Sequence, residues 1–256
     1  MTDNIAAAAA GRAPAGRMLF YKQPELLNHQ AHGSLGLKQP ARPFEFARKA
    51  KALPLTLGEI ATAQRYFPVI FSDLDNPVPL AVVGTAEDQN LFVDDDGRWD
   101  PATYVPAYAR CYPFALAAKS EEEFAVVIDR AADSISDDPD QPFFDGDKVT
   151  PETQALIDFC GRFDVERKRA AEFGKRLKEL GLLVRQQATR TAADGTETTI
   201  ASYVGVDREK LATLGADVVK ELFDKGYLAA VFAHAFSLEN WRGLMDRNLR
   251  RMSTTQ

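Results

Sequence analysis

The first half of the chain is organised as short apolar runs separated by turn-forming residues. Residues 69–71 (Val-Ile-Phe) and 79–83 (Pro-Leu-Ala-Val-Val) predict two buried, paired strands, because such runs are typical of strands. Residues 90–93 (Asn-Leu-Phe-Val) predict a third strand, and Asp-Asp-Asp-Gly at 94–97 predicts a tight turn directly after it. This half of the chain therefore favours a sheet.

Three further apolar segments extend the pattern. Residues 44–46 and 114–118 each predict a short strand, and the Val-Val-Ile run within 124–129 favours a strand there. The preceding residues 120–123 have a capping-box pattern that would instead open a helix. Residues 131–148 are acidic and rich in turn formers, which predicts an exposed loop.

Helix signals become frequent from the middle of the chain. A capping-box pattern that begins at Thr56 predicts a helix over residues 57–66. Thr150, followed by Pro and Glu, predicts the start of a long helix with apolar residues every three to four positions, ending before Gly181. The charged residues at 166–169 interrupt this period and predict a kink or a break.

The Asp-Gly pair at 194–195 is the clearest hairpin signal. Asp-Gly supplies the positive φ angles of a type I′ turn, so we expect strands at 182–193 and 196–206. Many Thr and Gln residues in both strands indicate that one face is wet.

Four helical or apolar segments complete the chain. Helices are expected over 207–214, with Asp207 as the cap, and over 216–225. The apolar run at 228–236 is consistent with a buried strand or a buried helix, and its flanking Gly and Ser favour the strand. Ser237 is then expected to cap a final amphipathic helix.

This distribution predicts the α+β class, with a mainly antiparallel or mixed sheet and helices concentrated after residue 150. No internal repeat or long linker divides the sequence, so residues 17–256 predict a single domain. Residues 1–16 are rich in Ala and lack an apolar period, which predicts a disordered leader.

Charge narrows the classes of partner. The chain of 256 residues has a formal net charge of −6, so its field repels phosphate backbones and nucleic acid is not expected as a partner. A C-terminal group of arginines at helical spacing favours the wet side of a helix over an anion site. Its members are Arg242, Arg247, Arg250 and Arg251.

Other features bear on location and cofactors. The apolar run at 5–10 is too short to span a membrane and follows an acidic rather than a basic residue, so we expect no membrane span and a cytoplasmic protein. Cys111 and Cys160 have neither CxxC spacing nor nearby His partners, and we interpret both as small core residues. No phosphate loop, dinucleotide turn or nucleophile elbow occurs, so no cofactor is expected.

Residues 99–114 form the densest unusual segment. Prolines restrict its backbone, its aromatic side chains offer flat contact area, and Arg110 offers a planar fork for a carboxylate or phosphate. The segment predicts either a binding groove or a rigid packed corner. The candidate ligand-binding residues, with a histidine from further along the chain, are Trp99, Tyr104, Tyr108, Arg110, Tyr112 and His234.

The three histidines raise a weaker hypothesis of a metal site. His29 and His32 have H-x-x-H spacing, and His234 would be a third ligand. No carboxylate pairs with them in sequence, and His234 lies in an apolar run that is typical of a core histidine. We therefore predict no metal, with His32 and His234 as the alternative.

A series of short segments occurs in a characteristic order. They are Ala-Leu-Pro-Leu (52–55), Tyr-Phe-Pro-Val-Ile-Phe (66–71), Asn-Leu-Phe-Val (90–93), Gly-Arg-Trp (97–99), Tyr-Val-Pro-Ala-Tyr (104–108), Tyr-Pro-Phe (112–114), Val-Asp (206–207) with Lys-Leu (210–211), and Ala-His (233–234) with Ser237. Together they resemble the SapC family of bacterial proteins over about residues 18–250. Cys111 departs from the second basic residue expected after Arg110, which argues against a two-arginine anion site.

The resemblance implies a bacterial source and an association with surface layers, and it brings no catalytic residues. The leading hypothesis is a non-catalytic accessory or binding protein that recognises a peptide or a small anionic ligand through residues 99–114. One alternative is an enzyme of unknown reaction, metal-assisted through the histidines. The other is a structural surface-layer component.

Overall fold

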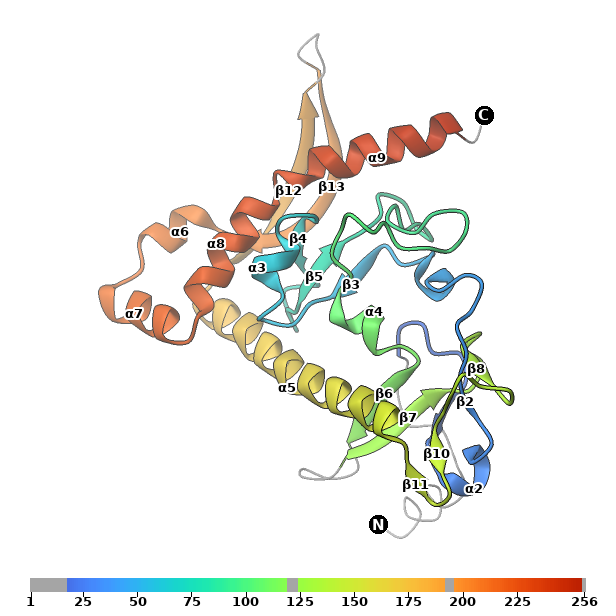
Figure 1. The fold of residues 1–256 in the computed structure, drawn as a ribbon. Helices are drawn as coiled ribbons and strands as arrows, with labels where there is room; N and C mark the ends of the chain where they lie inside the picture. Colours follow the sequence, from blue (N-terminus) through green and yellow to red (C-terminus); the bar gives the residue numbers. More distant parts are fainter. Residues whose placement is uncertain (1–17, 119–123, 192–195, 255–256) are drawn as a thin grey trace. The chain divides into compact units, whose positions relative to one another are not determined.

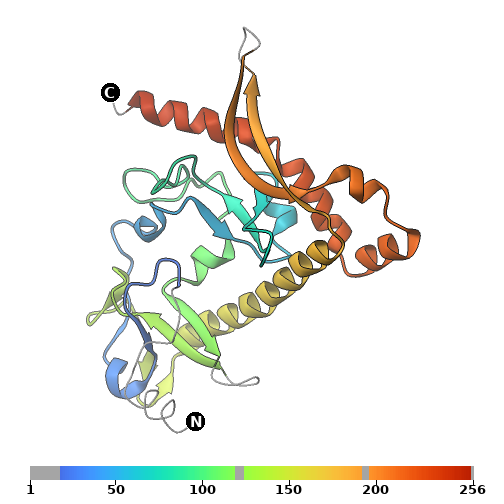
Figure 2. The same ribbon diagram turned by 180° about the vertical axis from the view of Figure 1, so that it is seen from behind.

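The structure is a computed structural model that describes residues 18–118, 124–191 and 196–254 (Figures 1 and 2). Contacts divide the chain into two compact units. Unit 1 comprises Met1–Ala47, Asp95–Arg98 and Ala109–Asp164, and unit 2 comprises Arg48–Asp94, Trp99–Tyr108 and Val165–Gln256. A single domain over residues 17–256 stays a prediction, and the predicted leader at 1–16 lies outside the described residues.

Unit 1 contains small antiparallel sheets and, within residues 18–47, two short helical segments. Its first sheet has the order β1 (Pro24–Leu26), β7 (Phe124–Asp129), β6 (Phe114–Ala118). The others are β8 (Ile135–Ser136), β2 (Gly36–Leu37), β9 (Gln141–Pro142), and the pair β10 (Phe144–Asp145) and β11 (Lys148–Val149). The helical segments are α2 (His29–His32) and the 3₁₀ helix η1 (Glu45–Ala47). The strands predicted at 114–118 and 124–129 are confirmed, and they pair with each other along their length.

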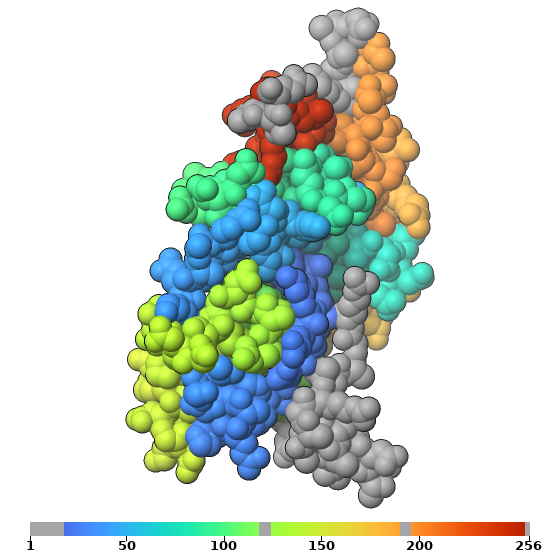
Figure 3. All heavy atoms as spheres, turned by 90° about the vertical axis from the view of Figure 1, so that its right-hand side faces the viewer, coloured from blue at the N-terminus to red at the C-terminus, as the bar shows by residue number. Residues whose placement is uncertain are grey.

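The prediction of an exposed loop at 131–148 is wrong in part. This segment forms β8, β9 and β10 and the start of β11, and Phe143 within it is fully buried in a core with Phe114 and Ile128. Figure 3 shows its atoms, in yellow-green, lying against the blue N-terminal residues, and β2 of those residues pairs with β8 on one side and with β9 on the other. The acidic composition predicted that the segment is exposed to solvent, but the few apolar side chains between the acidic residues are enough to anchor it.

Unit 2 is built on one antiparallel sheet. Its order is β12 (Leu183–Thr191), β13 (Glu197–Val206), β4 (Val69–Phe71), β5 (Pro79–Val82), β3 (Ala52–Pro54). The predicted strands at 69–71 and 79–83 are therefore confirmed and paired. The hairpin is also confirmed, and its turn at 194–195 lies outside the described residues. β13 and β4 share one registered pair, Val204 with Phe71, so the rest of the hairpin pairs only with itself among the described strands.

The long helix α5 (Pro151–Glu179) runs from unit 1 into unit 2 without interruption. Its start is as predicted, because the hydroxyl oxygen of Thr150 accepts a hydrogen bond from the backbone N–H of Thr153 at 3.3 Å. The predicted kink or break at 166–169 is wrong. These charged residues are good helix formers that lie partly or fully in solvent, and the buried stripe resumes at Ala170 and Phe173.

The remaining helices are mostly short. They are α3 (Ile60–Ala63), α4 (Ala107–Cys111), α6 (Arg208–Ala212), α7 (Ala216–Asp224), α8 (Tyr227–Ser237) and α9 (Asn240–Thr254). The helix predicted over 57–66 shrinks to α3 flanked by turns. Asp207 caps α6 as predicted, by accepting from the backbone N–H groups of Glu209 and Lys210. The antiparallel pairings and the helices after residue 150 confirm the α+β class.

The strand favoured at 228–236 is wrong, because this run is the helix α8. Its buried positions include Val231, His234 and Ser237, which recur at helical spacing, whereas Phe232 and Phe236 are exposed. Because apolar residues occupy both the buried and the exposed side of this helix, the sequence shows no helical period there. Ser237 consequently belongs to the last turn of α8 and does not cap α9.

Two other predicted strands are wrong for local reasons. Residues 44–46 lie in a turn and the helix η1. Residues 90–93 form turns, because the side-chain oxygen of Asn90 accepts from the backbone N–H of Phe92 at 2.9 Å and bends the chain. Only an isolated bridge between Val93 and Trp99 is left there.

The C-terminal arginines are less solvated than predicted. Arg247 forms an ion pair with Asp100 at 2.7 Å, and Arg251 donates to the backbone carbonyl of Asn90 at 2.8 Å. Two of the four arginines therefore bind another part of unit 2 instead of only facing water. In the described part of the chain, no helix combines the length and apolar character needed to cross a membrane.

Candidate functional site

Within unit 2, the polar groups of Trp99 and Tyr104 form hydrogen bonds with other side chains of the protein. Trp99 is buried, stacks on Phe92 with ring centroids 6.0 Å apart, and donates its indole N–H to Thr103 at 3.0 Å. The hydroxyl of Tyr104 donates to a carboxylate oxygen of Glu59 at 2.8 Å. Both polar groups are thus satisfied internally.

Glu59 is a buried carboxylate that organises this part of unit 2. One oxygen accepts from the Tyr104 hydroxyl and from the backbone N–H of Ala107 at 2.6 Å. The other accepts from the backbone N–H and the hydroxyl of Thr56 at 2.9 and 2.8 Å. The capping-box pattern located this pair, but only the fold shows that the carboxylate also holds residues 104–107.

Tyr112 and Asp129 form the corresponding arrangement in unit 1. The Tyr112 hydroxyl donates to Asp129 at 2.8 Å, and Asp129 also accepts from the backbone N–H groups of Lys22 and Gln23 at 3.1 and 2.7 Å. Burial, reinforced by Asp129, raises the pKa of Tyr112. The ring stacks on Phe46 at 4.0 Å, so this tyrosine is also part of the packing.

The other two candidates of the segment lie in α4. Tyr108 is half-buried and belongs to unit 2, whereas the exposed Arg110 belongs to unit 1. The guanidinium of Arg110 lies 5.0 Å from the ring centre of Phe159. The candidates from Trp99 to Tyr112 are therefore divided between the two units. Cys111, beside Arg110, is a buried core residue, as is Cys160.

His234 is buried in unit 2, where its ring links the backbones of β13 and β4 through hydrogen bonds. Its Nε2 accepts from the backbone N–H of Val206 at 3.1 Å, so the ring proton is on Nδ1, which donates to the carbonyl of Val69 at 2.7 Å. Burial lowers the pKa of His234 and keeps the ring neutral. The hydroxyl oxygen of Ser237 accepts from the backbone N–H of Val69. Side chains of α8 therefore bind backbone groups of β13 and β4 beside the single residue pair that these two strands share.

The other histidines are in unit 1. His32 is buried, with Nε2 at 3.1 Å from Glu25 and Nδ1 at 3.2 Å from Asn28 backbone atoms. His29 lies 3.3 Å from Asp147. Across residues 18–118, 124–191 and 196–254, no group of three His, Cys, Asp or Glu side chains is arranged to hold a metal ion.

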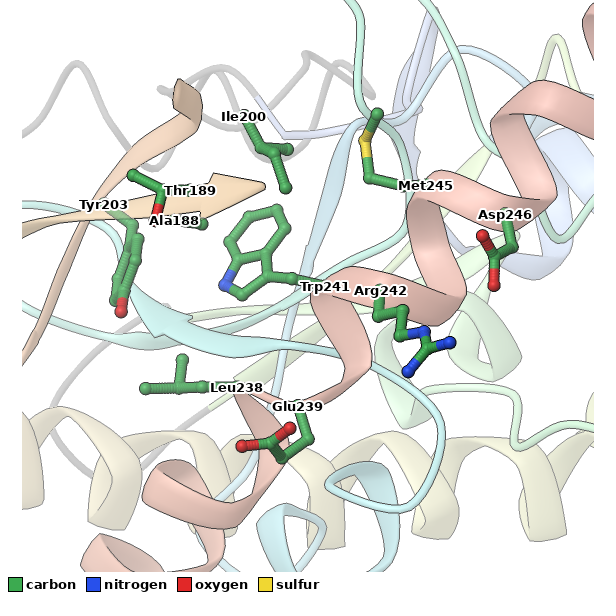
Figure 4. Close-up of a pocket in the computed structure, with 10 residues that line it drawn as sticks. All are labelled: Ala188, Thr189, Ile200, Tyr203, Leu238, Glu239, Trp241, Arg242, Met245 and Asp246. Atoms are coloured by element: carbon green, nitrogen blue, oxygen red, sulfur yellow. The ribbon is translucent and has the colours of Figure 1, made fainter. Parts of the chain in front are cut away.

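A cavity of about 610 Å³ lies in unit 2 between the hairpin β12–β13 and the start of α9 (Figure 4). Thr189 and Tyr203 line it from the hairpin, and Leu238, Trp241 and Met245 line it from the helical side. The ring centroids of Tyr203 and Trp241 are 5.8 Å apart. We call this cavity the Trp241 pocket. Its volume lies within the range of ligand sites.

Trp241 carries a polar group that the protein leaves unsatisfied. The residue is 7% exposed, and its buried indole N–H has no hydrogen-bond partner among the described residues. In Figure 4 the nitrogen edge of the indole faces the side of the pocket formed by Tyr203, Leu238 and Glu239. A buried N–H without an acceptor costs about 1–3 kcal/mol, so a ligand that supplies an acceptor would relieve that cost.

The charged lining of the pocket is also unpaired. Glu239, Arg242 and Asp246 line its helical side, are exposed, and form no ion pair or side-chain hydrogen bond within the part of the chain that the structure describes. The hydroxyl of Tyr203 likewise has no partner among those residues, and burial raises its pKa. The sequence marks Trp241 only as one apolar position of the last helix, and no local motif identifies the pocket.

The fold and the pocket define an α+β protein with a cavity of ligand size. A family model described as SapC matches residues 27–244, and the chain therefore belongs to the SapC family. This confirms the resemblance seen in the sequence. Neither a curated protein nor a solved structure matches the chain.

Proposed function

We propose that this protein is a non-catalytic accessory protein that binds a short peptide segment in the Trp241 pocket. The observation that carries the proposal is the unpaired indole N–H of Trp241 in the wall of a cavity of about 610 Å³. A peptide carbonyl is a fitting acceptor for this group. The indole N–H is covered in the free protein, so binding requires a side-chain shift at its neighbours, which is common at interfaces.

The dimensions of the pocket also favour a peptide. Its charged lining runs from Glu239 to Asp246, and seven helical residues span about 10 Å. An extended chain covers that distance in about three residues. Apolar side chains also line the pocket, Ile200 from β13 and Met245 from α9, and they suit the side chains of such a segment.

The other hypotheses have less support. Recognition through residues 99–114 stays a prediction, and the hydroxyls of Tyr104 and Tyr112 already donate to internal carboxylates. A metal-assisted enzyme would need the ring nitrogens of His234, and both already form hydrogen bonds. No observation favours a surface-layer role. A cytoplasmic location stays a prediction, and the two free cysteines fit a reducing compartment.

The proposal is tested by filling the pocket. Thr189→Trp places a large ring in the cavity from β12, where Thr189 is exposed. The wild-type protein is expected to enrich peptides from a displayed library of random heptapeptides, and Thr189→Trp is expected to lose at least tenfold in affinity for them.

The matched control is Thr198→Trp, an exposed position on β13 of the same hairpin that does not line the pocket. This variant is expected to bind the same peptides as the wild type. Failure of the wild-type protein to enrich any peptide would contradict the proposed function. Equal binding by Thr189→Trp would place the site elsewhere.

A further inference from the structure

We propose that the peptide bound in the Trp241 pocket carries a basic side chain, which the aromatic rings and the free carboxylates recognise together. This inference rests on the proposed function and names the chemistry of its ligand. It departs from the small anionic ligand expected from the sequence. Three features support it, two in unit 2 and one of the whole chain.

The first feature is the aromatic wall. The half-buried ring of Tyr203 and the ring of Trp241 meet at 39° with centroids 5.8 Å apart, and both line the cavity. The faces of Trp and Tyr rings attract ammonium and guanidinium groups electrostatically. The long alkyl part of a Lys or Arg side chain also packs well on apolar neighbours such as Leu238.

The second feature is the pair of carboxylates along the helical wall. Glu239 and Asp246 are seven positions apart, with Arg242 between them, so the three side chains lie on one helix face. None is neutralised by another described residue. Two acids against one base leave a local charge of −1, and basic side chains of a peptide are the direct counterpart of both acids.

The third feature is the charge of the whole chain. Its formal net charge of −6 attracts cationic ligands and repels anionic ones at low ionic strength. Arg242 adds a single site for a peptide carbonyl or carboxylate and so orients the segment. The unpaired N–H of Trp241 selects for a carbonyl acceptor, which every peptide unit carries. Charge therefore distinguishes among peptides, and the indole distinguishes peptides from simple cations.

The test uses two pools of acetylated, amidated pentapeptides that are random at three positions. One pool has Lys at the second and fourth positions, and the other has Glu there. Binding is followed through the NMR signal of the indole N–H of Trp241, assigned by its loss in Trp241→Phe. At 50 mM NaCl the Lys pool is expected to bind at least tenfold more tightly than the Glu pool. At 500 mM NaCl this preference is expected to shrink severalfold.

The double variant Glu239→Gln, Asp246→Asn is expected to remove most of the preference for Lys. Its control is Glu209→Gln, Asp217→Asn, which makes the same charge change at exposed positions of α6 and α7 and should retain the preference. Equal binding of both pools, or tighter binding of the Glu pool, would overturn this inference and leave the proposed function standing. Absence of any Trp241 shift with either pool would overturn both.

Discussion

Residues 99–114 and the Trp241 pocket are both rich in aromatic side chains, but they differ in how their polar groups are satisfied. In the first region the Trp99 indole and the Tyr104 and Tyr112 hydroxyls all donate to acceptors within the protein. In the second, the Trp241 indole has none. Aromatic density alone therefore does not separate a packed corner from a binding site, and our proposal of binding rests instead on the unsatisfied donor in the wall of the pocket.

Asp129→Ala is expected to have the largest effect on stability. Lys22, Gln23 and Tyr112 would each lose an acceptor, and Asp129 has no exposed surface through which water might replace it. We expect a loss of about 3 kcal/mol or more in the free energy of unfolding, measured by urea denaturation. The exposed Asp137→Ala should change it by less than about 0.5 kcal/mol. A loss below about 1 kcal/mol for Asp129→Ala would contradict the role of Asp129 as a buried acceptor within unit 1.

His234→Gln is expected to cost about 2 kcal/mol, because Val69 and Val206 lose well-placed partners in the core. A pH effect accompanies it. Burial lowers the pKa of His234, so below about pH 6.5 the unfolded chain binds a proton that the folded chain does not. The stability contribution is full above pH 6.5 and is lost as pH falls toward the folded pKa, by at most about 1.4 kcal/mol per pH unit.

This pH effect is measured by urea denaturation at pH 7.5, 6.5 and 5.5. In His234→Gln the decrease in stability between the upper and lower pH should be smaller than in the wild type, since other groups alone then contribute. An identical decrease in both proteins would contradict a buried, neutral His234 in the folded protein.

The smallest expected changes in stability are those of Tyr104→Phe and Trp241→Phe, and this pair compares residues 99–114 with the Trp241 pocket most directly. Tyr104→Phe removes a hydrogen bond to Glu59, and we expect it to cost about 1–2 kcal/mol without changing peptide binding. Trp241→Phe removes an N–H that has no partner, so the relieved cost offsets part of the lost packing and the net change should stay below about 1 kcal/mol. Peptide affinity should fall in Trp241→Phe alone. The reverse pattern would assign binding to residues 99–114.

Short-range signals in the sequence were sufficient for much of the fold. The cap at Thr150, the turn-forming Gly181 and the paired strands around 194–195 each depend on residues a few positions apart. Such signals act through backbone geometry and local hydrogen bonds, so they are visible without knowledge of the tertiary structure. The same order of short segments sufficed to identify the SapC family.

Local sequence patterns were thus enough to predict the α+β class, the long helix, the hairpin and the family. Tertiary structure decided that residues 228–236 form a helix, because the buried side of that apolar run is the one that carries His234 and Ser237. It also decided which polar groups are satisfied: His234 meets Val69 across 165 positions, and Tyr104 meets Glu59 across 45. A donor and its acceptor so far apart leave no periodic or local pattern, so only the folded chain shows that the Trp241 indole has no partner.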